Sequence, residues 1–189
     1  MKLLLYGSQT YSDTLAELAQ DCGHDVVGKI DDAGPGPGIL GTLSEISNTH
    51  PAGKYGIVLA IGYSNLTARW KAWQRVRNLG YNCPILVHPR AYIANSAKLS
   101  CGSVVMAGAL VDARSTVGEA SVLWPASCIN HDVALGSNCF ISPQATICGF
   151  AAIGNNSFIG AGAVVVDHSV LPPGTFVKAL SLFKGRLQT

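Results

Sequence analysis

The stretch SVVMAGALVDARSTVGEASVLWPASCINHDVALGSNCFISPQATICGFAAIGNNSFIGAGAVVV, residues 103–166, repeats with a period of six. Within it and on both sides, Val, Ile or Leu returns at every sixth position from Val87 to Val177, sixteen times without an insertion. The position four residues later is small in nearly every repeat, as at Ser115 and Ala145. Neither an α-helix nor an ordinary β-strand has this period.

A triangular coil accounts for the period, because each flat face needs one bulky inward residue and one small residue near the corner. Three faces of six residues make a turn of about eighteen residues, and each turn hydrogen-bonds to the next. The aliphatic column then forms one continuous core. The sequence therefore predicts a left-handed parallel β-helix over residues 87–182, with a little over five turns.

Before Cys83 the pattern is one of strands that alternate with helices. KLLLYG, HDVVGKI and YGIVLAIG are strand-like, residues 13–22 and 66–79 suit helices, and AGPGPG is a loop. Alternating strands and helices predict a small Rossmann-like α/β domain over residues 1–84, followed by the β-helix domain over residues 85–189. Ligands of such sheets bind beyond the carboxyl ends of the strands. The segments that this rule places along one edge are residues 7–12, 31–32 and 62–65.

Composition excludes several classes of partner. Of the 189 residues 48% are hydrophobic and 13% charged, which favours a compact, well-buried structure, and the net charge of +2 comes without a basic run. We therefore expect no nucleic-acid or membrane partner. The apolar run at the N-terminus stops at Gly7, short of a signal peptide, and the longest apolar run falls far below the roughly 18 residues of a membrane span. A soluble, cytoplasmic protein is expected.

The six cysteines contain no C-x-x-C pair and no closely spaced His. In a chain without a secretion signal they are expected to be reduced, core-filling thiols, and no metal site is expected.

Two segments, VHPRAYIANSAKLSCGSVVMAGALVDARSTVGE and INHDVALGSNCFISPQATICGFAAIGNNSFIGAGAVVV, resemble the hexapeptide-repeat sugar acetyltransferases. That family includes sialic acid O-acetyltransferases and bacillosamine-pathway N-acetyltransferases. In the N-terminal half the resemblance lies in the strand that ends in glycine, the Asp31-Asp32 pair, the G-T-L after the loop and the A-I-G before the second helix. It implies a homotrimer with acetyl-CoA as cosubstrate between neighbouring β-helices, and a nucleotide-linked sugar on the N-terminal domain.

The resemblance also implies roles for individual residues. Small residues would let the pantetheine of CoA approach the backbone, and cations near the C-terminus would meet its phosphates. The small cofactor-binding residues are Gly160, Ala161 and Ala179. The cations near the C-terminus are Lys178, Lys184 and Arg186, in and just after a segment that reads VKALSLFKG where the family usually has G-x-P-A-K. The residues implied to hold the nucleotide-linked sugar are Gly7, Ser8, Tyr11, Asp31 and Asp32.

His131 has a rationale of its own. With Asp132 it occupies the third and fourth positions of the hexad 129–134, where a side chain leaves the coil for the surface. Acyl transfer to an amine or hydroxyl needs a base near neutral pKa, and a neighbouring carboxylate can orient an imidazole. Gly149 lies eighteen residues later, so it should stack on His131 and offer its N–H to an oxyanion. His168 is expected to be a solvated turn residue.

Three residues depart from the family pattern. Tyr11 stands where the N-terminal loop of the family carries a His, Phe140 where a second active-site His is usual, and Trp124 where an Asn is usual. The last two replacements remove polar groups and add aromatic surface beside the catalytic position. They favour an amino-dideoxy sugar as acceptor, because unpaired sugar hydroxyls would be desolvated against the rings.

The first choice is therefore acetyl-CoA-dependent N-acetylation of a nucleotide-linked amino sugar. O-acetylation of a sialic-acid-like sugar uses the same base and cosubstrate, and the residues do not separate an amine from a hydroxyl acceptor. A non-catalytic β-helix that assembles or binds ligand is the alternative from another class. A metal-dependent carbonic anhydrase is disfavoured, because Ala113 and Gly149, not histidines, lie eighteen residues on either side of His131.

Overall fold

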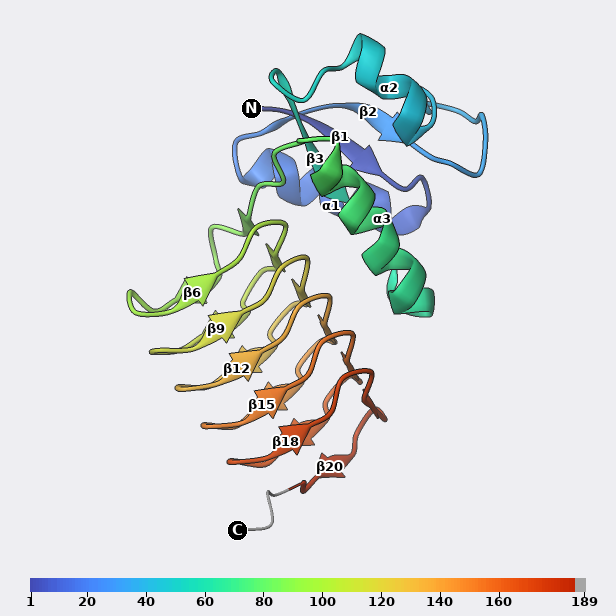
Figure 1. The fold of residues 1–189 in the computed structure, drawn as a ribbon. Coiled ribbons are helices and arrows are strands. Elements are labelled where there is room, and N and C mark those ends of the chain that lie inside the picture. Colours follow the sequence, from blue (N-terminus) through green and yellow to red (C-terminus); the bar gives the residue numbers. More distant parts are fainter. Residues whose placement is uncertain (186–189) are drawn as a thin grey trace. The chain divides into compact units, whose positions relative to one another are not determined.

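The structure, a computed structural model, describes residues 1–185. The chain divides into two compact units between Leu86 and Val87. Figure 1 shows an α/β unit at the N-terminal end of the chain and a stack of coils that follows it.

The N-terminal unit is a three-stranded parallel sheet in the order β2-β1-β3, with three α-helices. The strands and two of the helices fall where the alternation of the sequence predicts them. The elements are β1 (Lys2–Tyr6), α1 (Thr10–Asp21), β2 (Asp25–Ile30), α2 (Leu43–Thr49), β3 (Tyr55–Leu59), a short 3-10 turn (Tyr63–Asn65) and α3 (Leu66–Asn78).

The sequence analysis missed α2, although its start carries a recognisable signal. The Thr42 hydroxyl accepts from the backbone N–H of Glu45, and the Glu45 carboxylate accepts from the Thr42 N–H. This reciprocal capping box is written in the sequence as T-L-S-E. The helix then buries Leu43 and Ile46 on one face.

Gly7 forms the tight turn between β1 and α1. Its φ is +124°, and a Cβ there would lie 2.4 Å from the carbonyl oxygen of Ala60, just after β3. Only glycine combines this backbone conformation with so close an approach. The turn thereby brings the start of α1 next to the carboxyl end of β3.

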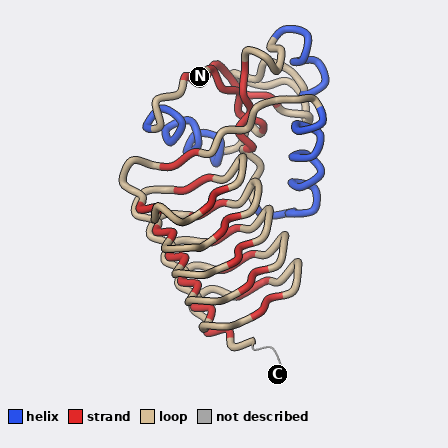
Figure 2. Tube along the Cα trace, turned by 60° about the vertical axis from the view of Figure 1, so that its left-hand side comes forward, coloured by secondary structure: helices blue, strands red, loops and turns tan. Residues whose placement is uncertain are grey.

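The second unit is a parallel β-helix made of two-residue strands, the fold class that the period of six predicts. Figure 2 shows the strands as stacked rungs along its faces. Each strand pairs in parallel with the strand eighteen residues away, as Val122 does with Phe140.

The strands form three sheets, which we call B, C and D. Sheet B is β4 (Leu86–Val87), β7 (Val104–Val105), β10 (Val122–Leu123), β13 (Phe140–Ile141), β16 (Phe158–Ile159) and β19 (Phe176–Val177). Sheet C is β5 (Tyr92–Ile93), β8 (Leu110–Val111), β11 (Cys128–Ile129), β14 (Thr146–Ile147), β17 (Val164–Val165) and β20 (Leu182–Phe183). Sheet D is β6 (Lys98–Leu99), β9 (Thr116–Val117), β12 (Ala134–Leu135), β15 (Ala152–Ile153) and β18 (Val170–Leu171).

The core of the β-helix consists of the two columns that the sequence predicts to point inward. The aliphatic residue at position 1 of each hexad, such as Ile129 or Ile147, is fully buried along the middle coils. The small residue at position 5, such as Ala145 or Ser115, is buried beside it. Small residues at this position let the chain bend at a corner without opening a cavity.

From Gly102 onward, position 4 of the hexad adopts a left-handed backbone conformation, which Gly, Asn and Asp signal at about half of these positions. Within residues 1–185, ten non-glycine residues have a positive φ, and all ten stand at this position. They include Arg114, Asp132, Phe150 and His168, with φ between 56° and 62°. Because L-residues rarely adopt this region, the stacking of the coils must impose it.

None of the helices in residues 1–185 is both long enough and apolar enough to span a bilayer. In the same residues no three His, Cys, Asp or Glu side chains cluster in a way that could hold a metal ion.

Candidate active site on the β-helix and pocket on the N-terminal unit

One corner of the β-helix, between sheets C and D, gathers the chemically active side chains. Because one coil is eighteen residues long, positions 3 and 4 of successive sheet C hexads stack into two columns at this corner. We call this the C–D corner. Its position 3 column is Asn95, Ala113, His131, Gly149 and Asp167, and its position 4 column is Ser96, Arg114, Asp132, Phe150 and His168.

His131 lies against Gly149, as the eighteen-residue spacing predicts. A Cβ on Gly149 would be 2.7 Å from Cε1 and 3.0 Å from Nε2 of His131. Within residues 1–185 the backbone N–H of Gly149 donates to no acceptor. The corner therefore combines a half-exposed imidazole with an N–H that remains available to a ligand.

Asp132 holds the other side of the His131 ring. Its Oδ2 lies 2.9 Å from Nδ1 of His131. Arg114, one coil earlier, donates from Nε to Oδ1 at 2.7 Å and from Nη2 to Oδ2 at 2.6 Å. These hydrogen bonds, those from Arg114 first and that from His131 second, lower the pKa of Asp132 to about 2. The carboxylate is therefore ionised at neutral pH and can only accept hydrogen bonds.

The charge state of Asp132 decides which nitrogen of a neutral His131 carries hydrogen. Because the carboxylate only accepts, Nδ1 must donate, and the hydrogen sits there. Nε2 is then left with its lone pair. This nitrogen can accept a proton from an incoming nucleophile, which is the chemistry of a general base.

Phe150 supplies an aromatic wall beside His131. Its ring meets the imidazole edge-to-face, with centroids 5.3 Å apart, and stacks on His168 at 4.8 Å with an interplanar angle of 7°. Phe150 is nevertheless 50% exposed, so one side of this aromatic cluster faces solvent. His168 is thus not merely a solvated turn residue, although its side chain remains 64% exposed.

The residues expected to bind CoA lie at another corner, between sheets B and C. Gly160 and Ala161 follow β16 and Ala179 follows β19, both strands of sheet B, whereas His131 follows β11 of sheet C. A Cβ on Gly160 would lie 2.4 Å from the backbone nitrogen of Ala179, so coil stacking alone already requires glycine there. Lys178 and Ala179 are exposed. Lys184 lies after β20, and Arg186 lies outside the described residues.

Trp124 and Phe140 also belong to the sheet B side. Trp124 follows β10 and is half-buried, whereas Phe140 is part of β13 and is buried. A single chain therefore does not bring these two rings to the C–D corner, and their expected place beside the catalytic position stays a prediction about a groove between neighbouring chains. The aromatic residue that one chain does place beside His131 is Phe150.

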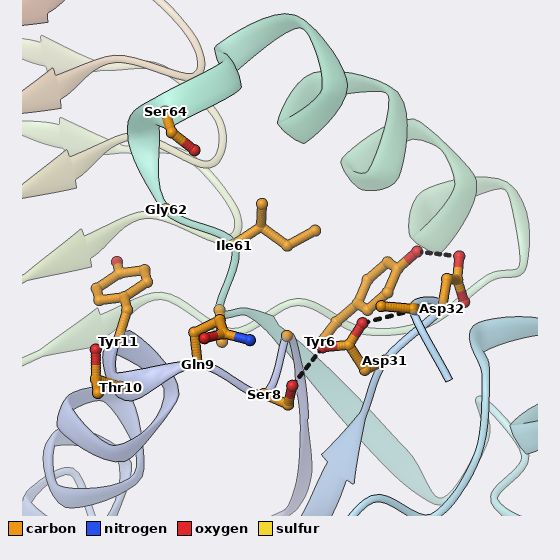
Figure 3. Close-up of a pocket in the computed structure, with 13 residues that line it drawn as sticks. Tyr6, Ser8, Gln9, Thr10, Tyr11, Asp31, Asp32, Ile61, Gly62 and Ser64 are labelled. Atoms are coloured by element: carbon orange, nitrogen blue, oxygen red, sulfur yellow. Dashed lines mark hydrogen bonds between the residues drawn. The ribbon is translucent and has the colours of Figure 1, made fainter. Parts of the chain in front are cut away.

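The N-terminal unit contains a pocket of about 490 Å³ at the carboxyl ends of its strands. Figure 3 shows that its walls come from the turn after β1, the end of β2 and the loop after β3. The structure thus brings together the three segments that the sequence analysis placed along one edge. Its lining includes all five residues expected to hold a nucleotide-linked sugar: Gly7, Ser8, Tyr11, Asp31 and Asp32.

Within this pocket the two aspartates have different surroundings. Asp31 accepts from the hydroxyl of Ser8 and from the backbone N–H of Ala33. Its immediate partners are therefore all on the rim of the pocket, where a ligand can reach the same carboxylate.

Asp32 makes hydrogen bonds to three elements of the unit. It accepts from the hydroxyl of Tyr6 at 2.7 Å, from Nη1 of Arg75 in α3, and from the backbone N–H of Leu43 at the start of α2. Partial burial opposes ionisation, but the hydrogen bonds from Tyr6, Leu43 and Arg75 outweigh it and lower the pKa of Asp32. For Tyr6, burial and the contact with Asp32 raise the pKa. Asp32 therefore ties β1, α2 and α3 together.

Sequence reasoning missed Arg114 and Phe150, although one simple signal could have found both. Each lies eighteen residues from Asp132, one before it and one after it, so each must stack on it. The eighteen-residue spacing that pairs His131 with Gly149 holds equally for Asp132. Applied to Asp132, it predicts an opposite charge directly beside the carboxylate.

The comparisons with known proteins agree with the fold. Residues 132–167 match the family model described as bacterial transferase hexapeptide (six repeats). The acetyltransferase domain of PglB from Neisseria gonorrhoeae FA1090 is 30% identical, with a TM-score of 0.90 over 98% of this chain and 92% of that chain. The same domain in complex with acetyl coenzyme A gives a TM-score of 0.89 over 98% of this chain and 91% of that one, also at 30% identity.

PerB from Caulobacter crescentus, solved in complex with CoA and GDP-perosamine, is 24% identical, with a TM-score of 0.88 over 99% of this chain and 90% of that chain. At 24% identity, this similarity shows that the two chains share a fold. No curated protein sequence matches the chain.

The parallel β-helix with a period of six and the match to the bacterial transferase hexapeptide model define the class of hexapeptide-repeat proteins. Since the likeness to the PglB domain runs over nearly the whole of both chains, the chain belongs to the hexapeptide-repeat sugar acetyltransferases, the family that its sequence resembles.

Proposed function

We propose that the protein transfers the acetyl group of acetyl-CoA to the amine of a nucleotide-linked amino sugar. The observation that carries the proposal is the arrangement at the C–D corner. Ionised Asp132 holds hydrogen on Nδ1 of His131 and leaves the lone pair on Nε2, and the imidazole lies against Gly149, whose N–H is available. The PglB domain with acetyl coenzyme A and perosamine N-acetyltransferase with GDP-perosamine support the choice of substrates.

The residues of the corner divide the chemistry between them. The amine nitrogen attacks the carbonyl carbon of the thioester while Nε2 of His131 takes the proton that the nitrogen must lose. The Gly149 N–H stabilises the negative charge that builds on the carbonyl oxygen. When the C–S bond breaks, the CoA sulfur leaves with the electron pair and receives the proton from His131. The products are the acetamido sugar and free CoA.

The separation of the two corners supports a homotrimer. One chain places the general base at the C–D corner and the cofactor-binding residues Gly160, Ala161 and Ala179 at the corner between sheets B and C. A site that needs both sets must be completed by a neighbouring copy, and cyclic symmetry repeats such a site at every interface. In this arrangement Trp124 of the neighbour approaches His131, whereas Phe140 is buried within its own chain.

The pocket on the N-terminal unit is the proposed site for the nucleotide-linked sugar. A volume of about 490 Å³ lies within the range of about 300–1,000 Å³ that small-molecule sites occupy. Asp31, at the rim, offers acceptors to the N–H groups of a base or the hydroxyls of a ribose. Both proposed substrates are cytoplasmic metabolites, so we place the reaction in the cytoplasm.

The acceptor is an amino-dideoxy sugar rather than a fully hydroxylated one. Each hydroxyl desolvated against an aromatic ring without a partner costs about 1–3 kcal/mol. Phe150 already presents such a ring beside His131 in one chain, and the neighbour would add Trp124.

The experiment is thiol release from acetyl-CoA against a panel of nucleotide-linked amino sugars, their hydroxylated counterparts and free sialic acids. The expected result is turnover with an amino-dideoxy nucleotide sugar and an N-acetylated product by mass spectrometry. Turnover confined to sialic acids would replace the amine acceptor with a hydroxyl. No turnover with any acceptor, while the chain still binds acetyl-CoA, would favour a ligand-binding β-helix.

A further inference from the structure

Arg114 is the one cation in direct contact with Asp132 within residues 1–185. Arg114 and Asp132 stand at position 4 of consecutive coils at the C–D corner, with φ of 61° and 59°. The guanidinium meets the carboxylate with two parallel hydrogen bonds, Nε to Oδ1 and Nη2 to Oδ2. This two-pronged geometry fixes the plane of the carboxylate as well as its position.

The backbone of both residues is fixed by hydrogen bonds to the preceding coil. The backbone N–H of Arg114 donates to Oγ of Ser96, one coil earlier, at 3.0 Å. The backbone N–H of Asp132 donates to the carbonyl oxygen of Ala113 at 2.9 Å. The guanidinium and the carboxylate are therefore presented to each other by two coils whose spacing cannot change.

Folding stability gives little reason for this ion pair. The Arg114 side chain is 62% exposed, and pairs so accessible to water contribute little to stability. The ion pair instead fixes the position of the carboxylate beside His131. Oδ2 of Asp132, the atom that Nη2 of Arg114 contacts, is also the atom that lies 2.9 Å from Nδ1 of His131.

We propose that Arg114 is a positioning residue, which fixes the Asp132 carboxylate so that it holds the hydrogen of His131 on Nδ1 and leaves Nε2 to accept the substrate proton. The inference rests on the base role of His131 in the proposed function. It makes the working unit a chain of three residues across two coils, Arg114, Asp132 and His131.

Without Arg114 the carboxylate can rotate toward water, and the imidazole is held less firmly in one tautomer. The fraction of molecules with an unprotonated Nε2 aimed at the acceptor then falls. Partners of this kind, one step removed from the reacting atoms, are worth about 10–100-fold in activity. We expect Arg114→Ala to lower kcat about 10-fold, with the KM for acetyl-CoA unchanged.

The fold tolerates this substitution. Ala120 and Ala126 occupy the same hexad position in the two following hexads, with φ of 54° and 56°. Arg114→Lys keeps the charge but offers one donor group in place of the fork, so it should recover only part of the lost activity. The matched control is Arg90→Ala, because Arg90 is also exposed and stands at position 4 of an earlier hexad.

A second measurement reads the proposed geometry without substrate. Nitrogen chemical shifts from ¹⁵N-labelled histidine, assigned by comparison with His131→Ala, report which ring nitrogen of His131 carries hydrogen. We expect the Nδ1–H form in the wild type and in Arg90→Ala, and a mixture of forms in Arg114→Ala. A protein that proved to have another activity would still show this difference, so the readout is separate from the proposed function.

A double variant separates positioning from a direct role. If Arg114 acts through Asp132, adding Arg114→Ala to Asp132→Asn lowers kcat by less than about 2-fold further, because residues that work as a unit are not additive. An undiminished 10-fold loss in that background would overturn the proposal, as would a raised KM for acetyl-CoA at unchanged kcat. So would wild-type kcat and tautomer in Arg114→Ala.

Discussion

The imidazole of His131 lies directly over the Cα of Gly149, so that a Cβ at position 149 would sit 2.7 Å from Cε1 of the ring. The backbone of Gly149 is not in the left-handed region, so alanine is not strained there by its φ. Gly149→Ala should therefore act by displacing the ring of His131. A displacement of about 1 Å can cost about 100-fold in kcat.

Steady-state kinetics and thermal unfolding of Gly149→Ala test this prediction together. Tm should stay close to that of the wild type while kcat falls. Gly53→Ala is the control, since nothing lies within 4 Å of a Cβ at that glycine. Unchanged kcat in Gly149→Ala would mean that the position of the His131 ring does not matter to the reaction.

The two-corner site predicts complementation between inactive variants. His131→Ala removes the base, and Ala161→Trp fills the corner between sheets B and C, so each trimer alone should be inactive. In trimers assembled from equal amounts of both chains, about a quarter of the sites combine an intact base with an intact neighbouring corner. Activity should return to about that fraction of the wild type. No recovery, or a monomer mass by light scattering, would contradict a shared site.

Asp32 should make the stability of the N-terminal unit fall in acid. Its pKa is lowered by folding, so its stabilising effect is complete above the unfolded pKa of about 4 and is lost as the pH falls through the lower folded pKa. Asp32→Ala leaves the buried Tyr6 hydroxyl without its acceptor and should cost about 1–3 kcal/mol at pH 7.

Urea unfolding between pH 7 and pH 3 measures both effects. The free energy of unfolding of Asp32→Ala should be lower at pH 7 and depend less on pH. Asp13→Ala, which removes an exposed ion pair with Lys29, is the matched control and should change stability little. Equal losses in both variants would remove the special role of Asp32.

Phe150 should help to hold the ring of His131 in place. An edge-to-face aromatic pair is worth about 0.5–1.5 kcal/mol, which corresponds to about 2–10-fold in rate if the interaction acts on the reacting geometry. Phe150→Ala should lower kcat by that factor. Phe176→Ala removes an equally stacked ring, on Phe158, and serves as control. An equal loss in both variants would point to general packing.

The period of six could be predicted from sequence because it is a consequence of packing. Position 1 and position 5 face the same narrow interior, so their size and polarity are constrained in every hexad, as Ile129 and Val133 illustrate. The left-handed corners are signalled only in part. Gly, Asn or Asp, which favour this conformation, stand at several of the corners, but so do Arg114, Phe150 and Leu180, which carry no such signal.

The distribution of the site over two corners could also have been deduced from numbering. His131 and Gly149 differ by eighteen residues and share a corner. Three hexads make one coil, so two residues share a corner only when their hexads lie three, six or another multiple of three apart. The hexads of Gly160 and Trp124 lie five and one hexads from that of His131, so these residues belong to another corner. The family resemblance placed the groove between neighbouring β-helices, and the three-sheet geometry agrees that one chain does not bring the two corners together.

The most direct test of the account is a comparison of the wild type and His131→Ala at saturating acetyl-CoA, with the best acceptor of the panel. The account predicts that kcat falls about 10²- to 10⁴-fold, the usual contribution of a positioned base, while the Kd for acetyl-CoA measured by calorimetry stays the same. A His131→Ala protein that keeps near-normal kcat with this acceptor would contradict it.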